Sequence, residues 1–269
     1  MTGLRLSVRS ALFYWRNHLS VLAGTALACA VLVGALLVGD SVEFSLRQAA
    51  LLRLGKIHFA LSSEGRFFRQ ELAERLESEA NTPVAPVLFL RGIAIRQRGV
   101  DTEPLQVNNV QVAGIDGRFW RLAGGRGVEL DDHEIAINAK LASRLDVKPG
   151  DEISIRIAKP SLLSRDAPLS SRRGDDTVRG TFSVAAIVTD EQMGRFNLAA
   201  SQVVPCNVFV SRKWLQDSIS IAGKANLLLA GGSEGLTVKK LNDAVEKTWR
   251  IEDAGLVIRE FEGRGLFQL

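Results

Sequence analysis

The sequence predicts an α+β protein with one N-terminal transmembrane helix, followed by an extracytoplasmic α/β subdomain that carries an inserted β-rich subdomain. Two observations lead to this prediction. Residues 19–39 form a run of 21 residues without a charge, and about 20 apolar helical residues span a bilayer core of roughly 30 Å. The 230 residues that follow contain no second run of this kind and alternate between strand-like and helix-like patterns.

The uncharged run 19–39 is interpreted as an uncleaved transmembrane helix. A secretory signal peptide would be cleaved after Ala28-Cys29-Ala30, and a lipoprotein signal would use Cys29. However, the apolar run continues beyond Ala30, where a mature secreted protein should become polar. Cys29 is therefore expected to be a small apolar helix residue and not a lipid attachment site.

Residues 1–18 are predicted to be a basic amphipathic segment that lies among the lipid head groups. Three arginines flank a set of apolar residues at helical spacing, namely Leu4, Val8, Ala11, Leu12 and Trp15. The alternative is a basic segment without fixed structure. Arg16 before the span, and Asp40 and Glu43 after it, favour a cytoplasmic N-terminus, with residues 40–269 on the other side of the membrane.

Residues 40–120 and 222–269 are predicted to form the membrane-proximal α/β subdomain. The expected elements are a continuation of the membrane helix (41–54) that stops at Gly55, a short buried strand (56–62), an amphipathic helix (66–80), strands at 84–97, 105–115 and 225–230, a helix capped by Thr237 (237–250), and a last strand (256–260).

Residues 121–221 are predicted to form the inserted β-rich subdomain. The expected elements are strands at 134–138, 152–157, 181–189, around Val203 and at 207–210, with a short helix at 139–145. The segment 159–180 is rich in serine and charge and shows no periodicity, so it is expected to be an exposed, mobile loop.

Composition excludes several classes of protein. With 46% hydrophobic and 24% charged residues, the chain is neither disordered nor collagen-like. Two cysteines, Cys29 and Cys206, are too few for a disulfide scaffold or a four-cysteine zinc site. Three of the four net positive charges lie in residues 1–39, whereas a DNA-binding domain spreads its charge over a phosphate-facing surface. We therefore expect no nucleic-acid partner.

Catalytic motifs are not recognisable. The glycine-rich stretch Gly231–Gly235 lacks the lysine of a phosphate-binding loop, and no G-x-S-x-G motif occurs. His133-Glu134 begins like the zinc-protease motif H-E-x-x-H, but residue 137 is isoleucine. The histidines are far apart in the sequence: His18, His58 and His133.

The remaining candidate residues have simpler explanations. Asp131–Glu134 offers oxygen ligands for a hard cation, but a solvated acidic turn explains it better. His58 is expected on one side of a strand, and Cys206 as a small buried residue. We therefore predict a protein that is not an enzyme, without catalytic, cofactor-binding or metal-binding residues and without a cofactor.

Four stretches carry a resemblance to a known family. Leu6–Gly39 begins with the basic SVRSALFYWRNHLS and ends in a Gly/Ala-rich span before Asp40-Ser41. Downstream follow VQVAGIDGRFWRLAGG, EIAINAKLASRLDVKPGDEISIRI and GTFSVAAIVTD. In this order they resemble the first helix and the periplasmic core domain of MacB/FtsX-type ABC transporter permeases.

The resemblance implies a function. The chain would be the non-catalytic permease portion of an ABC transporter in the bacterial inner membrane. It would couple a separate cytoplasmic ATPase to movements of its periplasmic domain, with a second permease copy and membrane lipids as further partners. Complete permeases of this type have three more membrane helices, so we expect the sequence to be part of a longer protein or one half of a split one.

Two interpretations from other classes stay open. One is a single-pass, membrane-anchored periplasmic binding or assembly module that works without an ATPase. The other is a membrane-tethered hydrolase with an unrecognised site, which a broad hydrolase assay would detect. The first differs from a permease in having no further apolar span in its reading frame.

The anchor prediction has a direct test. Because the apolar run continues past both possible cleavage sites, sequencing of the membrane-extracted protein should find the Met1 end, with or without the methionine. A mature chain that begins at Cys29 or Val31 would contradict it.

Overall fold

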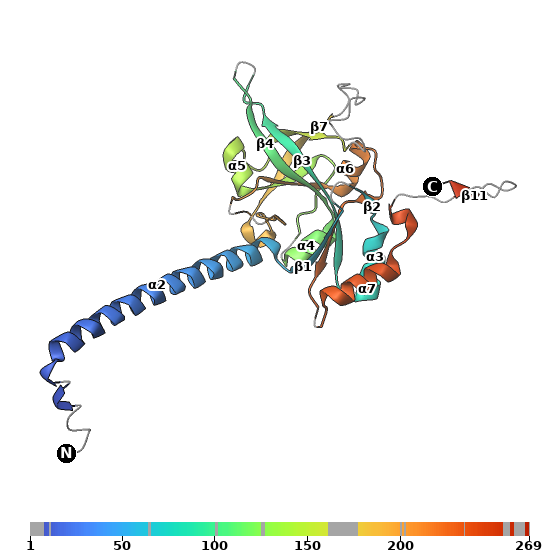
Figure 1. The fold of residues 1–269 in the computed structure, drawn as a ribbon. Helices are drawn as coiled ribbons and strands as arrows, with labels where there is room; N and C mark the ends of the chain where they lie inside the picture. Colours follow the sequence, from blue (N-terminus) through green and yellow to red (C-terminus); the bar gives the residue numbers. More distant parts are fainter. Residues whose placement is uncertain are drawn as a thin grey trace. The chain divides into compact units, whose positions relative to one another are not determined.

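The structure of this chain is a computed structural model (Figure 1). It describes residues 8–10, 12–63, 66–99, 102–124, 127–160, 177–199, 201, 203–233, 235–254, 259–260 and 267–268. The chain divides into two compact units, Met1–Leu51 and Leu52–Leu269.

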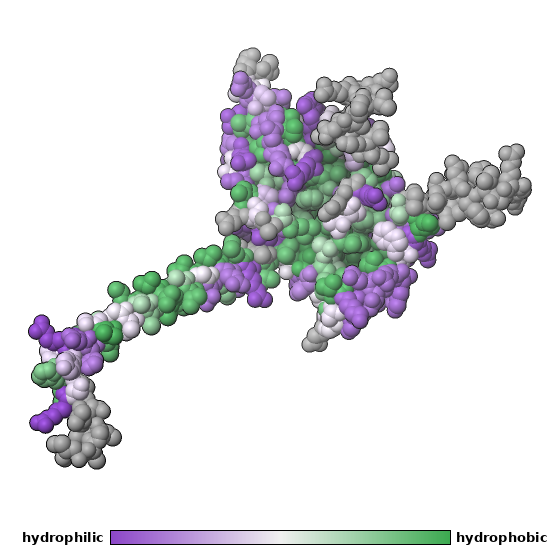
Figure 2. All heavy atoms as spheres, viewed as in Figure 1, coloured by the Kyte–Doolittle hydropathy of each residue, from purple (hydrophilic) through white to green (hydrophobic). Residues whose placement is uncertain are grey.

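Helix α2 (Trp15–Leu54) is one continuous helix of 40 residues, which at 1.5 Å per residue is about 60 Å long. Its stretch Trp15–Gln48 is long and apolar enough to cross a membrane. Figure 2 shows the middle of the helix apolar, with hydrophilic residues on either side of that stretch. The predicted continuation over 41–54 is confirmed. Residues 1–7 and 11 lie outside the described residues, so the interfacial segment 1–18 stays a prediction.

The second unit is built around a six-stranded barrel. Its strands are β3 (Val84–Arg96), β4 (Leu105–Ile115), β5 (Glu134–Asn138), β6 (Glu152–Ala158), β7 (Thr177–Val188) and β8 (Asn207–Ser211). The pairing order is β3-β4-β8-β5-β7-β6, and β6 pairs back with β3 to close the ring. Every strand contributes apolar side chains to one buried cluster, among them Ile135, Ile155, Val184 and Val210.

A three-stranded layer extends from one end of β3. There β10 (Leu227–Gly231) pairs with Val84–Val87, and β1 (Ile57–Ser62) pairs with β10. Helices α3 (Glu71–Ala80) and α7 (Val238–Thr248) cover one face of the layer and contact each other. They lie together in Figure 1. The other face carries the apolar cluster that includes Ile57, Leu229 and Phe119, which is called the junction cluster below.

In its described residues, the segment 121–221 does not make a sheet of its own. Its four strands complete the barrel with β3 and β4, and β8 lies parallel to β4, with Val112 opposite Val208. The division of the domain at residues 120 and 222 stays a prediction about its subdomains. The prediction of a loop at 177–180 is wrong, because these residues extend β7 by pairing with β6. Residues 161–176 lie outside the described part.

Three other predicted strands need correction. Strand β1 is mostly exposed along its length and not buried, because it pairs only on its β10 side among the described residues. The region around Val203 is a bend, and Val203 is exposed. The predicted strand 225–230 is divided into β9 (Lys224–Ala225) and β10 by Asn226, whose side chain bonds with the backbone N and O of Phe89 at 2.7 and 2.8 Å.

Helix boundaries differ for similar reasons. The predicted helix 66–80 begins only at Glu71, because β2 (Phe68–Arg69) pairs with β9. The helix capped by Thr237 is confirmed, and the Thr237 hydroxyl accepts from the backbone N of Lys240. Of the predicted last strand, 259–260 belong to β11 (Arg259–Glu260), which pairs with β12 (Phe267–Gln268), and 256–258 lie outside the described residues.

Two short helices were missed by the sequence analysis. They are α4 (Gly117–Ala123), which follows β4, and α6 (Arg212–Ser218), which follows β8. The helix α5 (Ala139–Leu145) has the predicted bounds. Two 3₁₀ turns complete the domain, η1 (Asp190–Gln192) and η2 (Ile251–Ala254).

We expect one ion pair between α3 and η2 to stabilise the domain. Asp253 is 1% exposed, pairs with Arg75 and accepts from the backbone N of Arg250 at 2.8 Å. Asp253→Ala should lower the free energy of unfolding by about 2–3 kcal/mol, because it leaves the mostly buried Arg75 without its partner. Urea unfolding of the full chain in detergent, followed by tryptophan fluorescence, measures the loss.

The matched control is the exposed pair Lys247–Glu79, which joins α7 to α3 at 3.0 Å. Glu79→Ala should cost less than about 1 kcal/mol, since exposed ion pairs are screened by water. Equal losses in the two variants would contradict a special role for Asp253.

Candidate functional site

The clearest candidate site is the segment Arg53–Lys56, where α2 ends and the strands begin. Gly55 has a φ of +54°, a left-handed conformation that costs other residues about 1–2 kcal/mol. A Cβ at this position would lie 3.0 Å from the carbonyl oxygen of Leu122 and 3.1 Å from the sulfur of Met193. Glycine is therefore favoured at this position by both the backbone conformation and the packing.

The neighbours of Gly55 make their own contacts. The backbone N of Lys56 donates to the carbonyl oxygen of Leu122 in α4 at 2.9 Å. The Arg53 guanidinium donates to the carbonyl oxygen of Ser201 at 2.6 Å. Leu54 packs against the junction cluster. The end of α2 is thus held by α4 and by the segment 189–206, which connects β7 to β8.

Two buried asparagines fix this connecting segment to the barrel. Asn138, the last residue of β5, donates to the carbonyl oxygens of Gly194 and Pro205 at 2.9 and 2.7 Å. Asn207, the first residue of β8, donates to those of Gly194 and Phe196 at 3.1 and 2.9 Å. Both asparagines are 2% exposed. A buried amide without partners costs about 1–3 kcal/mol, so these bonds favour one position of the segment.

Aromatic rings join α4 to the connecting segment. Phe119 of α4 is fully buried, and its ring centroid lies 5.6 Å from those of Phe196 and Phe209. It lies 5.3 Å from that of Trp120. Such pairs contribute about 0.5–1.5 kcal/mol each beyond the burial of their area. The two elements that hold the end of α2 are therefore packed against each other.

An ion-pair network lies at the beginning of α4. Asp116 caps the helix by accepting from the backbone N of Arg118, and its carboxylate pairs with the side chains of Arg118 at 3.0 Å and Arg212 at 2.8 Å. Arg212 also donates to the carbonyl oxygen of Pro86 at 2.8 Å. Burial lowers the pKa of the Arg212 guanidinium, because desolvation disfavours its charged form. The network ties α4 to α6 and β3.

The residues that the sequence singled out do not come together. His58 is an exposed residue at a bulge in β1, with its Nδ1 3.0 Å from the carbonyl oxygen of Lys56. Asp131–His133 forms an exposed turn, the half-buried Glu134 begins β5, and Cys206 is buried as predicted. Gly231 ends β10. Within the described ranges, no group of three His, Cys, Asp or Glu residues is placed to hold a metal ion.

Sequence reasoning found one residue of the junction and missed the others. Gly55 was identified as a helix stop. Asn138 stands between a predicted strand and a predicted helix, which is the usual place of an N-cap, and this signal could have found it. Leu122 and Ser201 contribute their carbonyl oxygens. Such contacts leave no trace in residue type.

Comparisons with known proteins give structural likenesses. No protein-family model and no curated protein matches the sequence. The periplasmic region of MacB from Actinobacillus actinomycetemcomitans is 11% identical, with a TM-score of 0.42 over 67% of this chain and 73% of that one. The extracellular domain of the noncanonic ABC-type transporter YknZ from Gram-positive bacteria is 13% identical, with a TM-score of 0.39 over 73% and 88%.

The requirement for glycine at the junction can be measured. Gly55→Ala should lower the free energy of unfolding by about 2–3 kcal/mol, because it adds a close contact to the cost of the left-handed backbone. Gly223→Ala is the matched control. Gly223 also has a positive φ, +72°, but a Cβ there meets nothing within 4 Å, so the loss should be about 1–2 kcal/mol. Equal losses in urea unfolding would contradict the packing at the junction.

Proposed function

We propose that this chain is the non-catalytic permease portion of an ABC transporter of the MacB/FtsX type. In this proposal α2 crosses the membrane, and residues 40–269 lie outside the cytoplasm. A cytoplasmic ATPase on a separate subunit or chain drives α2, and α2 passes the movement to the domain. The further partners are a second permease copy and the membrane lipids.

The unbroken helix α2 is the observation that carries this proposal. It joins the uncharged run 19–39 to the junction at Arg53–Lys56 without an interruption. A hydrogen-bonded helix is a stiff connector, because each bend must break or lengthen backbone hydrogen bonds. A displacement at the membrane would then reach Leu54 and Gly55 with little loss.

The stretches that resemble the family support the proposal by where they lie. VQVAGIDGRFWRLAGG covers the end of β4 and α4, and so includes Leu122 and the aromatic residues beside the junction. EIAINAKLASRLDVKPGDEISIRI covers β5, α5 and β6, and includes Asn138. GTFSVAAIVTD covers most of β7 and leads into the connecting segment. One of the three stretches thus includes Leu122, which accepts from the backbone N of Lys56, and another includes Asn138, which holds the connecting segment.

Charge favours the proposed orientation. Arg16 lies close before the uncharged run, whereas the positive residues after it, Arg47, Arg53 and Lys56, begin eight residues beyond its end. Positive residues in short flanking segments tend to remain in the cytoplasm. The N-terminus would then face the ATPase, and the larger unit would lie in the periplasm or outside the cell.

Interruption of α2 tests the proposal. Leu46 lies between the uncharged run and the junction and is exposed. Leu46→Pro should kink or break the helix at a cost of about 3 kcal/mol or more, because proline removes a backbone donor and clashes with the preceding turn. The test uses a complete, reconstituted permease that contains this chain together with its ATPase. In the variant, ATP hydrolysis should continue but should no longer be coupled to movement of the extracytoplasmic domain.

Leu46→Ala is the matched control, since alanine keeps the helix and removes the same side chain. Coupling should survive in this variant. The proposal fails if Leu46→Pro leaves coupling intact while the domain remains folded. A membrane-anchored binding or assembly module without an ATPase would then be the better explanation.

A further inference from the structure

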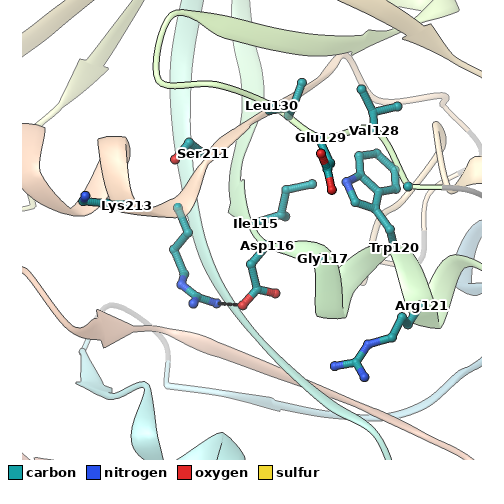
Figure 3. Close-up of a pocket in the computed structure, with 12 residues that line it drawn as sticks. Ile115, Asp116, Gly117, Trp120, Arg121, Val128, Glu129, Leu130, Ser211 and Lys213 are labelled. Atoms are coloured by element: carbon teal, nitrogen blue, oxygen red, sulfur yellow. Dashed lines mark ion pairs between the residues drawn. The ribbon is translucent and has the colours of Figure 1, made fainter.

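A cavity of about 500 Å³ opens where the two parallel strands β4 and β8 end. Its walls come from the turn between β4 and α4, the turn between β8 and α6, and residues 127–130 (Figure 3). The volume lies within the range of small-molecule sites in proteins, which is about 300–1,000 Å³.

The charged groups at the cavity fall into two sets. Asp116 and Arg212 are paired with each other, as described above, and are therefore committed to holding α4 and α6 together. The side chains of Arg121, Lys213 and Glu129 also line the cavity, but they have no ion pair or hydrogen bond within the described part of the chain. Figure 3 shows Glu129 near Val128 and Leu130, and the Asp116 carboxylate directed toward its ion-pair partner. The charged side chains without a partner among the described residues thus include both positive and negative groups.

The cavity also has an apolar wall. Trp120 is 4% exposed and lies beside Val128 in Figure 3, and Gly127 packs so closely that a Cβ there would lie 3.0 Å from Trp120. Val128 and Leu130 pack against the junction cluster. Gly117 also lines the cavity, and a Cβ on this residue would meet no atom within 4 Å. The space beside Gly117 is therefore open to a ligand.

We propose that this cavity binds a small zwitterion with an apolar body, such as an apolar amino acid or a short apolar peptide. Arg121 or Lys213 binds the carboxylate, and Glu129 binds the ammonium group. The apolar body lies against Trp120 and Val128. A simple anion would lie near the like charge of Glu129, and a simple cation near those of Arg121 and Lys213, so a ligand with both charges complements the cavity better.

The position of the cavity relates it to the junction. Arg121 directly precedes Leu122, whose carbonyl oxygen holds the backbone N of Lys56. A bound ligand would therefore contact the helix that holds the end of α2. The binding site itself does not depend on the proposed transporter function.

Calorimetric titration of the full chain in detergent tests the site, with the dipeptide Leu-Leu as the probe. Leu-Leu should bind, and two analogues should each bind about tenfold or more weakly, because a charge-assisted hydrogen bond contributes about 1.4 kcal/mol or more. N-acetyl-Leu-Leu lacks the ammonium group, and Leu-Leu amide lacks the carboxylate.

Variants locate the binding. Glu129→Gln should abolish the preference for Leu-Leu over its N-acetyl analogue, and the double variant Arg121→Gln with Lys213→Gln should abolish the preference over the amide. Gly117→Val should weaken all binding, because its side chain enters the cavity. Lys239→Gln and Glu246→Gln, at exposed positions on α7, are the controls and should bind as the parent does.

Several outcomes would overturn the proposal. The proposal is wrong if Leu-Leu does not bind at millimolar concentrations, or if N-acetyl-Leu-Leu binds as tightly as Leu-Leu. It is also wrong if the charge variants bind Leu-Leu as tightly as the parent chain does. Circular dichroism checks that each variant is folded. If Gly117→Val does not fold, the charge variants decide, because Arg121, Lys213 and Glu129 are exposed and their changes should leave the fold intact.

Discussion

The left-handed turn at Gly55 is the constraint on which the rest of the structure depends. It directs the chain out of a long helix and into a strand within two residues, and it brings the backbone N of Lys56 to the carbonyl oxygen of Leu122. A side chain at residue 55 would crowd this approach, since its Cβ would lie 3.0 Å from that carbonyl oxygen. Because Leu122 belongs to α4, the position of the helix end is tied to the aromatic rings of Phe119 and Trp120. The chain at the end of the helix therefore contacts the core of the domain through Leu54 and the backbone of Lys56.

The barrel supports the elements that contact residues Arg53–Lys56. Its ring of strands is closed by the pairing of β6 with β3, so no strand of the ring can move without disturbing two neighbours. Asn138 and Asn207 extend from this ring to the connecting segment, whose carbonyl oxygens they satisfy. That segment in turn accepts the Arg53 guanidinium at Ser201. These bonds favour the observed position of the segment, because their loss would leave buried amide N–H groups and carbonyl oxygens without partners.

Strands and helices with strong periodicity were predictable. The helix 41–54, the strand 134–138, the helix 139–145 and the cap at Thr237 follow from apolar spacing and from the residues at their ends. The helices α4 and α6 were missed although α5, which also has seven residues, was predicted, so their length does not explain the omission. Their caps, Asp116 and Ser211, were local signals that stood directly after recognised strands.

By itself, the sequence determined the uncharged span, the continuation of the helix to Leu54, the glycine stop at residue 55 and most of the strands, since these depend on residues close together in the chain. Only the tertiary structure decided that 121–221 shares its sheet with β3 and β4, that Asn226 divides a strand, and that Arg53 and Lys56 contact carbonyl groups of distant residues. The cavity beside Trp120 belongs to this second group. Every residue carries a backbone carbonyl, and every strand has backbone groups along its edges. Residue type therefore does not identify the partners of these groups, which are set by how the barrel closes.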